Sequence, residues 1–193
     1  ELKNGGIIGA TIPGIPLIMS GRSKYLAWGF SAGNGDDTDI YIEQLNPLDE
    51  TQYNDGNNFV SFDTKKEIIK IYGSKSRTID LLWANNRPVL PNNFFNIRQI
   101  MPQNKVASIK STALDSFDKS YSSLFNMTTQ TNIKSAQSQF NDYVTPIYNM
   151  VLADKDNVTL KVIGKIPRRN PNHFGQGRLP SQGWLKRNQW NGY

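Results

Sequence analysis

A strand, a glycine-broken turn and a second strand follow one another between Ala27 and Leu45, and no other feature constrains the fold as strongly. The segment reads AWGFSAGNGDDTDIYIEQL. Gly33 and Gly35 permit backbone angles that other residues avoid, and their missing side chains let another group approach the main chain. The sequence therefore predicts a bend at which another group meets the backbone closely.

Three aspartates crowd the same turn, at Asp36, Asp37 and Asp39. Closely spaced carboxylates on a bend can gather around a hard cation, although an EF-hand is disfavoured because the glycine precedes the acids and their alternation is missing. The competing interpretation is that these side chains cap backbone amides of the turn. Taken alone, the residues favour capping, and a calcium site of another kind stays open.

The residue types that common enzyme sites require are scarce. The absence of cysteine excludes disulfides, thiolate metal sites and a cysteine nucleophile. The single histidine, His173, lies in a loop, where we expect a surface residue rather than a general base, and one histidine cannot assemble the common zinc ligand sets. Neither a Gly-Lys-Ser phosphate loop nor a Gly-x-Ser-x-Gly elbow is present. The chain by itself therefore lacks an obvious active site.

The net charge is +6, and much of the basic excess lies late in the chain. A basic tail that also carries Trp184 and Trp190 is one signature of nucleic-acid binding. The basic residues are spread among proline and glycine rather than stacked on one helical face, which favours a solvated surface and argues against a nucleic-acid partner. They are Lys161, Lys165, Arg168, Arg169, Arg178, Lys186 and Arg187.

No apolar run approaches the roughly 18 residues that a membrane helix needs, so we predict no transmembrane segment. Two sequons, Asn126-Met-Thr and Asn157-Val-Thr, would permit glycosylation in a secretory pathway. We therefore expect a secretory, extracellular or lysosome-like compartment rather than the cytosol.

Short apolar runs between turn residues predict that the first half of the chain is built from strands. A meander of this kind predicts an antiparallel sheet in which strands adjacent in sequence pair. The predicted strands are Ile7–Ile12, Leu17–Ser20, Tyr25–Phe30, Ile40–Leu45, Phe59–Phe62, Glu67–Ile71 and Thr78–Trp83, with two more at Ile147–Ala153 and Val158–Ile163.

The middle of the chain changes to helical spacing, which predicts two amphipathic helices whose apolar stripes face the core. We expect Ser111 or Thr112 to cap the first helix, Thr131 to cap the second and Pro146 to end the second. The first stripe comprises Leu114, Phe117, Tyr121, Leu124 and Phe125, and the second comprises Ile133, Ala136, Phe140, Tyr143 and Val144.

The segment from Ala27 to Leu45 resembles the penicillin acylase (penicillin amidase) family of N-terminal-nucleophile amide hydrolases. The match includes the Ala-Trp-Gly run, the Ala-Gly-x-Gly-Asp-Asp-x-Asp turn and the following Tyr-x-Glu strand. It extends to GATIPGIPLIMSGRSKYLAWG near the start and to GRLPSQGW and QWNGY at the end. The resemblance therefore covers nearly the whole chain, with low similarity between Asn46 and Ile79.

The resemblance implies a structural calcium ion at the aspartate turn. The positions that match the family's ligands are the side chains of Asp36 and Asp39 and the backbone carbonyls of Thr38 and Pro167, with further ligands outside this chain. It also implies that the backbone N–H of Ala32 is an oxyanion-hole donor, where a fixed N–H stabilises charge that develops on the substrate's carbonyl oxygen. The alternative is that Ala32 is small only for packing in the sheet.

The fold that the resemblance implies is α+β, namely a portion of the four-layer αββα sandwich of N-terminal-nucleophile hydrolases. We expect one partial domain over residues 1–193, β-rich over 1–110, with a helical pair over 111–145 and strands and a loop-rich tail over 146–193. Its apolar faces should need the other segments of the same precursor, the α chain and the rest of the β chain, to cover them.

The activity that the resemblance implies is hydrolysis of a small linear amide through an amino-terminal serine, freed by autocatalytic cleavage of a precursor and acting with its own α-amino group. Glu1 cannot be that nucleophile. The resemblance places the serine upstream of Glu1, and it places the asparagine that supplies a second oxyanion donor downstream of Tyr193.

One departure from the family pattern bears on activity. The family commonly has His-Gly before Pro-Val, whereas Asn86-Arg87 precede Pro88-Val89 here. A large charged residue where glycine is usual indicates a changed local turn or a relaxed constraint on activity. Together with the basic tail, it motivates an alternative function, in which the fold is kept as a catalytically inactive scaffold or assembly subunit.

Overall fold

The computed structural model describes residues 5–193, which form two compact units. Of the described residues, the first unit combines 5–37 with 112–166, and the second combines 38–111 with 167–193. Each unit is thus built from two stretches that are distant in the sequence. Within the described residues, no helix is long and apolar enough to cross a membrane.

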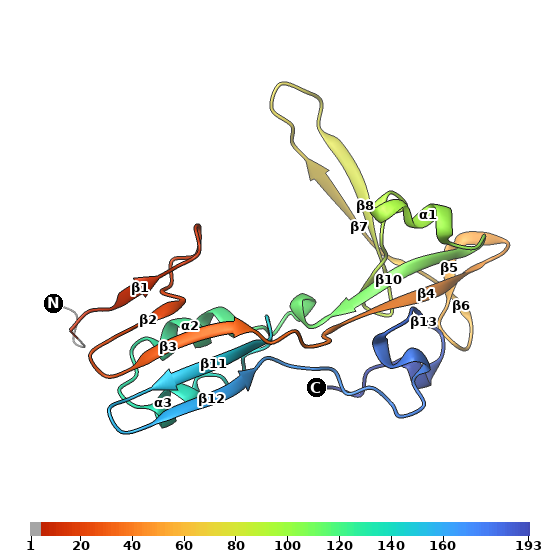
Figure 1. Cartoon of the computed structure of the whole chain (residues 1–193). Helices are drawn as coiled ribbons and strands as arrows, with labels where there is room; N and C mark the ends of the chain where they lie inside the picture. The colour runs from red at the N-terminus through yellow and green to blue at the C-terminus, as the bar shows by residue number, and fades with distance from the viewer. Residues whose placement is uncertain (1–4) are drawn as a thin grey trace. The chain divides into compact units, whose positions relative to one another are not determined.

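A five-stranded antiparallel sheet with the order β1-β2-β3-β11-β12 forms the first unit. Helices α2 (Ser120–Met127) and α3 (Ile133–Ser138) cover one face of this sheet (Figure 1). A short 3-10 turn at Thr112–Leu114 precedes them. The strands are β1 (Ile8–Ala10), β2 (Ser20–Arg22), β3 (Ala27–Ala32), β11 (Tyr148–Ala153) and β12 (Val158–Ile163).

The helix-covered face of this sheet carries the core of the unit, in which Trp28 of β3 and Met150 and Leu152 of β11 are buried with side chains from the helical segment. The opposite face is apolar but exposed, because alternate residues of β12 point there. Val158, Leu160 and Val162 are 74%, 67% and 59% exposed. The unit therefore has one covered and one uncovered sheet face.

The two predicted apolar stripes differ in burial. Ala136, Phe140, Tyr143 and Val144 of the second stripe are buried, as predicted, although α3 ends at Ser138. In the first stripe the core-facing expectation was wrong for Leu114, Phe117, Tyr121 and Phe125, which are exposed, whereas Leu124 packs against the core.

Leu114 and Phe117 lie before α2, which begins only at Ser120, so the predicted helical spacing does not apply to them. Tyr121 and Phe125 lie within α2, but the helix buries Ser120, Ser123 and Met127 instead. Asp118 accepts the backbone N–H of Ser120 at 2.8 Å and so satisfies one of the helix's first donors. The predicted caps were also wrong. Lys119 precedes α2 without a side-chain cap, and Asn132 caps α3 by accepting the N–H of Ser135.

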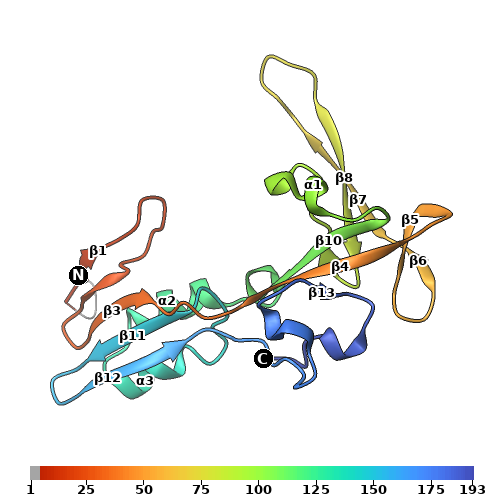
Figure 2. The same cartoon turned by 45° about the vertical axis from the view of Figure 1, so that its right-hand side comes forward.

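Two sheets form the second unit. In the first, the order is β10-β4-β5-β6, and β13 pairs with β4 in parallel; in the second, β7, β8 and β9 follow one another. The long β7–β8 ribbon extends away from β4 and β10 (Figure 2). The strands are β4 (Thr38–Asn46), β5 (Asp49–Asn54), β6 (Phe59–Ser61), β7 (Asp63–Ile69), β8 (Arg77–Ala84), β9 (Arg87–Pro88), β10 (Lys105–Ser111) and β13 (Ser181–Gln182).

Short helical turns complete the second unit. They are the 3-10 turns at Phe94–Asn96, Phe174–Gly177 and Lys186–Asn188 and the single-turn helix α1 (Ile97–Ile100). The last two 3-10 turns lie in the carboxy-terminal tail, where the sequence showed little periodicity.

Pairing of strands adjacent in sequence is confirmed for most of the meander, but it fails at the glycine turn. β3 pairs with β11, and β4 pairs with β10 and β5, so the two strands flanking the turn belong to different sheets. The turn is thus a crossing between two sheets rather than a hairpin.

Ile147 is the residue that the glycine turn approaches. A Cβ atom on Gly33 would lie 2.7 Å from Cγ2 of Ile147, and one on Gly35 would collide with its Cδ1. Gly164, after β12, is equally close, with 2.8 Å to Cγ1. The predicted close approach is therefore confirmed, whereas the expected special backbone angles belong to Asn34, with φ 48°, rather than to the two glycines.

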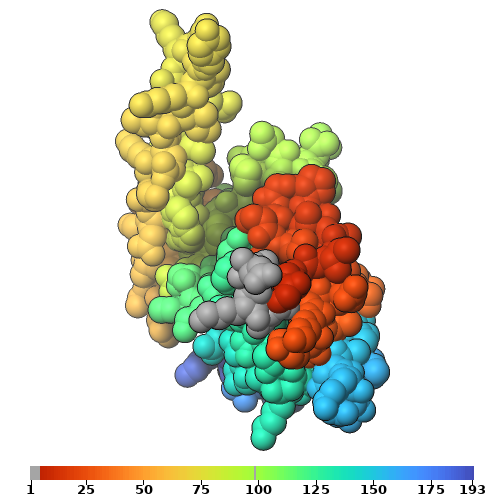
Figure 3. Space-filling view, turned by 90° about the vertical axis from the view of Figure 1, so that its left-hand side faces the viewer, coloured from red at the N-terminus to blue at the C-terminus, as the bar shows by residue number. Residues whose placement is uncertain are grey.

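Figure 3 looks onto the end of the first unit where the turn between β2 and β3 (orange) and the turn between β11 and β12 (light blue) lie at the surface. Both turns line one shallow hollow, together with Thr131 and Asn132. This is the end of the sheet opposite to the one that carries the glycine turn, since β3 runs from Ala27 towards Ala32.

Replacing Gly164 by alanine tests the packing around Ile147. Gly164 has φ +115°, and the added Cβ would meet Ile147, so we expect a loss of about 3 kcal/mol in the free energy of unfolding. Gly14→Ala is the matched control, because Gly14 also has a positive φ (+85°) but no atom lies within 4 Å of the added Cβ. It should cost about 1 kcal/mol. Urea unfolding of the protein carrying this chain measures both, and equal losses would contradict the packing argument.

Candidate functional site

The backbone N–H of Ala32 points towards an open edge of the first unit's sheet. The N–H of Gly33 donates to the carbonyl of Ile147 at 2.9 Å. Ala32 pairs with Tyr148 one position earlier. Hydrogen-bonded and non-hydrogen-bonded pairs alternate in antiparallel strands, so the N–H of Ala32 is directed away from β11.

On the other side of β3, the neighbouring strand does not reach Ala32. The pairs between β2 and β3 are Gly21 with Trp28 and Arg22 with Ala27, and they end at Trp28. Ala32 is itself exposed and carries only a methyl group. Within residues 5–193, no strand pairs with this side of Ala32, so the ladder leaves its N–H without a bond.

The four predicted calcium ligands divide between the units. Asp36 belongs to the first, whereas Thr38, Asp39 and Pro167 belong to the second. Their donor atoms, carboxylate and carbonyl oxygens, are those that calcium prefers, so the donor chemistry fits. In the part of the chain that the structure describes, no group of three or more acidic or histidine side chains is arranged to hold a metal ion.

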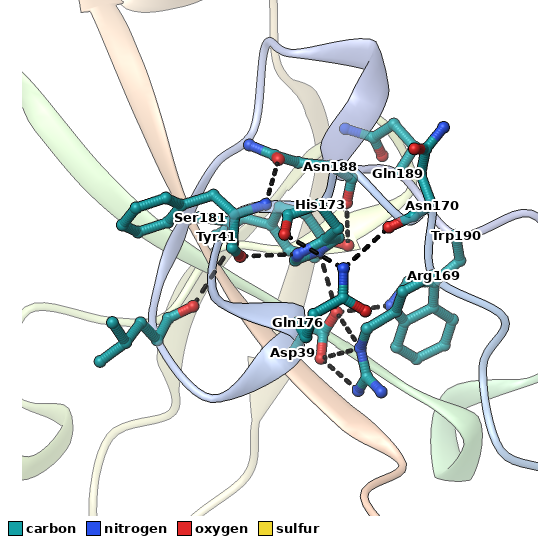
Figure 4. Close-up of polar contacts among 12 residues, drawn as sticks. Asp39, Tyr41, Arg169, Asn170, His173, Gln176, Ser181, Asn188, Gln189 and Trp190 are labelled. Atoms are coloured by element: carbon teal, nitrogen blue, oxygen red, sulfur yellow. Dashed lines mark hydrogen bonds and ion pairs between the residues drawn. The ribbon is translucent and has the colours of Figure 1, made fainter.

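Asp39 is the centre of a buried polar cluster (Figure 4). Its side chain is 1% exposed and forms a salt bridge with Arg169, whose Nη2 lies 2.6 Å from Oδ1. Arg169 Nε lies 3.1 Å from both carboxylate oxygens, and Trp190 Nε1 donates to Oδ2 at 2.7 Å. A calcium ion at Asp39 would therefore share this carboxylate with a guanidinium group.

His173 is buried, so the expectation of a surface residue was wrong. Its Nδ1 lies 2.7 Å from the carbonyl oxygen of Phe174 and must carry the proton there, because a carbonyl only accepts. Its Nε2 lies 3.5 Å from Oδ2 of Asp39. Ser181 also donates to the carbonyl of Phe174, at 2.9 Å, instead of to His173. Serine, histidine and aspartate therefore meet here without forming a catalytic triad.

The carboxy-terminal tail is held to β4 rather than solvated throughout. The hydroxyl of Tyr41 donates to the carbonyl of Asn188 at 2.9 Å, and the side chain of Asn188 accepts the N–H of Phe174. Arg169 and Trp190 belong to the basic tail that was considered for nucleic-acid binding. Arg169 forms a salt bridge with Asp39, and Trp190 donates a hydrogen bond to it. They are therefore not available to contact phosphates or to stack on bases.

Arg87, the residue that departs from the family pattern, forms a second buried charge pair. Its Nη2 lies 2.8 Å from Oε1 of Glu43, and the two side chains are 1% and 0% exposed. Its other donors reach Ser108, Gln189 and the carbonyl of Gly183. Its charged carbon also lies 4.4 Å from the ring centre of Tyr41. Arg87 is thus the centre of a hydrogen-bond network that joins β4, β9, β10 and the tail.

Two pKa shifts follow from this burial. The pKa of Tyr41 is raised, first by loss of water around its hydroxyl and then by the negative charge of Asp39. The pKa of Lys110 is lowered, first by burial and then by the positive charge of Arg87, while Asp39 acts in the opposite direction. Burial is the largest cause of each shift, and the charged side chains of Asp39 and Arg87 contribute to both.

A family model described as penicillin amidase matches residues 1–193, which is the entire chain. The chain belongs to the penicillin amidase family. Among curated relatives it is 28% identical over 196 residues to the acyl-homoserine lactone acylase QuiP of Pseudomonas syringae pv. tomato, and 27% identical over 191 residues to QuiP of Pseudomonas aeruginosa. These matches cover 97% and 96% of this chain but 22% of each relative.

The fold is similar to that of a solved family member. A thermostable penicillin G acylase from Alcaligenes faecalis matches with a TM-score of 0.82 and 24% identity, over 98% of this chain and 33% of the other. The α+β fold that the sequence predicted is therefore confirmed. The chain corresponds to a portion of the larger penicillin acylase fold.

The Glu43–Arg87 pair gives a prediction on stability. Arg87→Met leaves a carboxylate buried without its charge partner, and we expect a loss of about 3–5 kcal/mol in the free energy of unfolding. Adding Glu43→Gln to Arg87→Met should recover part of this loss. The exposed pair Lys119–Asp142 is the control, and Lys119→Met should change stability by less than about 0.5 kcal/mol. Urea unfolding measures each loss. If the loss in the double variant equals the sum of the losses in Arg87→Met and Glu43→Gln, this view is contradicted.

Proposed function

We propose that the protein carrying this chain hydrolyses small linear N-acyl amides. Its family, and relatives named for acylase activity on acyl-homoserine lactones and penicillin G, support this class of substrate. The nucleophile is an amino-terminal serine outside residues 1–193, freed by cleavage of a precursor. The other segments of that precursor, an α chain and the rest of a β chain, complete the site.

The observation that carries the proposal is the backbone N–H of Ala32. It lies at the end of β3, directed away from β11 and beyond the last pair with β2. As a tetrahedral intermediate forms, negative charge develops on the substrate's carbonyl oxygen, and a fixed N–H that already points to that oxygen stabilises it without reorganisation. The small side chain of Ala32 leaves room for the acyl group to approach.

Two substrates test the activity. The purified protein is incubated with an N-acyl-homoserine lactone and with a phenylacetyl amide, and the released amine is measured. Release of amine from either substrate supports amide hydrolysis. If neither substrate releases amine, amide hydrolysis is contradicted and the inactive scaffold is the function that remains. The departure that motivated this scaffold, Arg87, has a structural role in the pair with Glu43, so it no longer favours loss of activity.

Ala32→Pro tests the donor itself. Proline removes the N–H but no ladder bond to β11, since that N–H points to the other side of the strand. We expect kcat to fall by a factor of about 10²–10³ with little change in KM. Thermal unfolding shows whether the variant is folded, and Ala32→Gly, which keeps the N–H, is the control. A folded Ala32→Pro variant with full activity would refute the assignment.

We also propose that a calcium ion binds at the aspartate turn, with Asp36, Asp39 and the carbonyls of Thr38 and Pro167 as ligands. The family resemblance and the oxygen-only donor set support this, and the ion would stabilise the turn. Calcium at 100 times its dissociation constant would add about 2.7 kcal/mol to the stability.

The melting temperature in calcium and in a chelator tests this site. Calcium should raise the melting temperature of the natural protein and of Asp37→Asn, the neighbouring control, but not that of Asp36→Asn. If the natural protein melts at the same temperature in both solutions, or if both variants respond equally, the calcium site at these residues is wrong.

A further inference from the structure

The side chain of Asn149 reaches from β11 to the residue that carries the proposed oxyanion donor. Its amide nitrogen Nδ2 donates to the backbone carbonyl of Ala32 at 3.2 Å. The same nitrogen lies 3.5 Å from the hydroxyl of Ser31. Asn149 stands opposite Ser31 in the register of the two strands, one position away from Ala32.

This contact matters because the ladder bonds neither polar backbone group of Ala32. Its N–H faces away from β11, and the pairs with β2 end at Trp28. Its carbonyl also faces away from β11, because the N–H of Gly33, on the opposite side of the same peptide group, points to Ile147. A hydrogen bond to this carbonyl restrains the peptide group between Ala32 and Gly33. Through the Cα atom of Ala32 it also limits the orientation of the preceding peptide group, which carries the N–H.

A second restraint lies immediately beyond. The N–H of Gly33 donates to Ile147, and Ile147 fills the space that the glycines of the turn leave open. The backbone of Ala32 is thus held on one side by the Asn149 side chain and on the other by the Gly33 contact. The two restraints come from Ile147 and Asn149, which lie on either side of Tyr148, the first residue of β11.

We propose that Asn149 is a positioning residue, which holds the Ala32 backbone so that its N–H is aimed at the developing oxyanion. Asn149 acts through Ala32 and does not itself touch the reacting atoms. The proposal rests on the proposed amide hydrolysis. It adds a residue on β11, far from Ala32 in sequence, to the set that determines the rate.

Removing the donor while keeping the shape of the side chain tests this role. Asn149→Leu and Asn149→Asp have nearly the same size but cannot donate to the carbonyl. We expect kcat to fall about 10-fold in both, with KM changed less than about 2-fold, because an aimed oxyanion donor acts mainly in the transition state. Asn141→Asp, the same change at an exposed asparagine before β11, is the matched control and should leave kcat unchanged.

Two further readouts separate positioning from a general loss of structure. Inhibition by an acyl phosphonate, which resembles the tetrahedral intermediate, should weaken by the same factor as kcat, whereas inhibition by the free acid product should not. The melting temperature should stay close to that of the natural protein. If Asn149→Leu weakens inhibition by the phosphonate and by the acid product by the same factor, the positioning role is wrong. The same holds if kcat is unchanged in this variant.

Hydrogen–deuterium exchange tests the role of Asn149 independently of the proposed catalytic activity. In Asn149→Leu, the peptide containing residues 29–35 should take up deuterium several times faster than in the natural protein, while other peptides of the first unit are unchanged. A natural protein without amidase activity would overturn the proposed function, and faster exchange would still support the restraint on Ala32. Unchanged exchange in a variant of an active protein would overturn the positioning role.

Discussion

The close contact between the glycine turn and Ile147 is the constraint on which the candidate site depends. Gly33, Gly35 and Gly164 each leave no room for a Cβ atom beside Ile147, and the N–H of Gly33 donates to its carbonyl. This contact ends the pairing of β3 with β11 at a defined residue. Because hydrogen-bonding pairs alternate along the ladder, it also decides which way the N–H of Ala32 points.

Buried charge organises the second unit in the same way that packing organises the first. Asp39, Tyr41, Glu43 and Leu45 alternate along β4 and all point inward. Two carboxylates on the buried face of one strand are costly unless each has a partner, and Arg169 and Arg87 supply those partners. The tail that provides Arg169 and Trp190 is therefore held beside β4 by the need to pair Asp39, although its sequence has no regular pattern.

The sequence predicted the parts of the fold that local patterns govern. Strands with apolar alternation and the buried half of the helical segment were found, whereas β5, with the sequence DETQYN, and β10, with KVASIKS, were missed because polar residues dominate them. The role of Asp39 was missed because its partner Arg169 lies 130 positions away, a distance that no local pattern spans. Ala32 was predicted from the family resemblance alone, since its direction depends on the register with β11.

The mature amino terminus of the polypeptide that contains residues 1–193 tests the central claim most directly. Intact mass and terminal sequencing of the protein from its natural source give this terminus. Our account predicts a serine, threonine or cysteine upstream of Glu1, newly exposed by cleavage of a precursor. An unprocessed polypeptide, or a terminus at another type of residue, would contradict amide hydrolysis by an amino-terminal nucleophile.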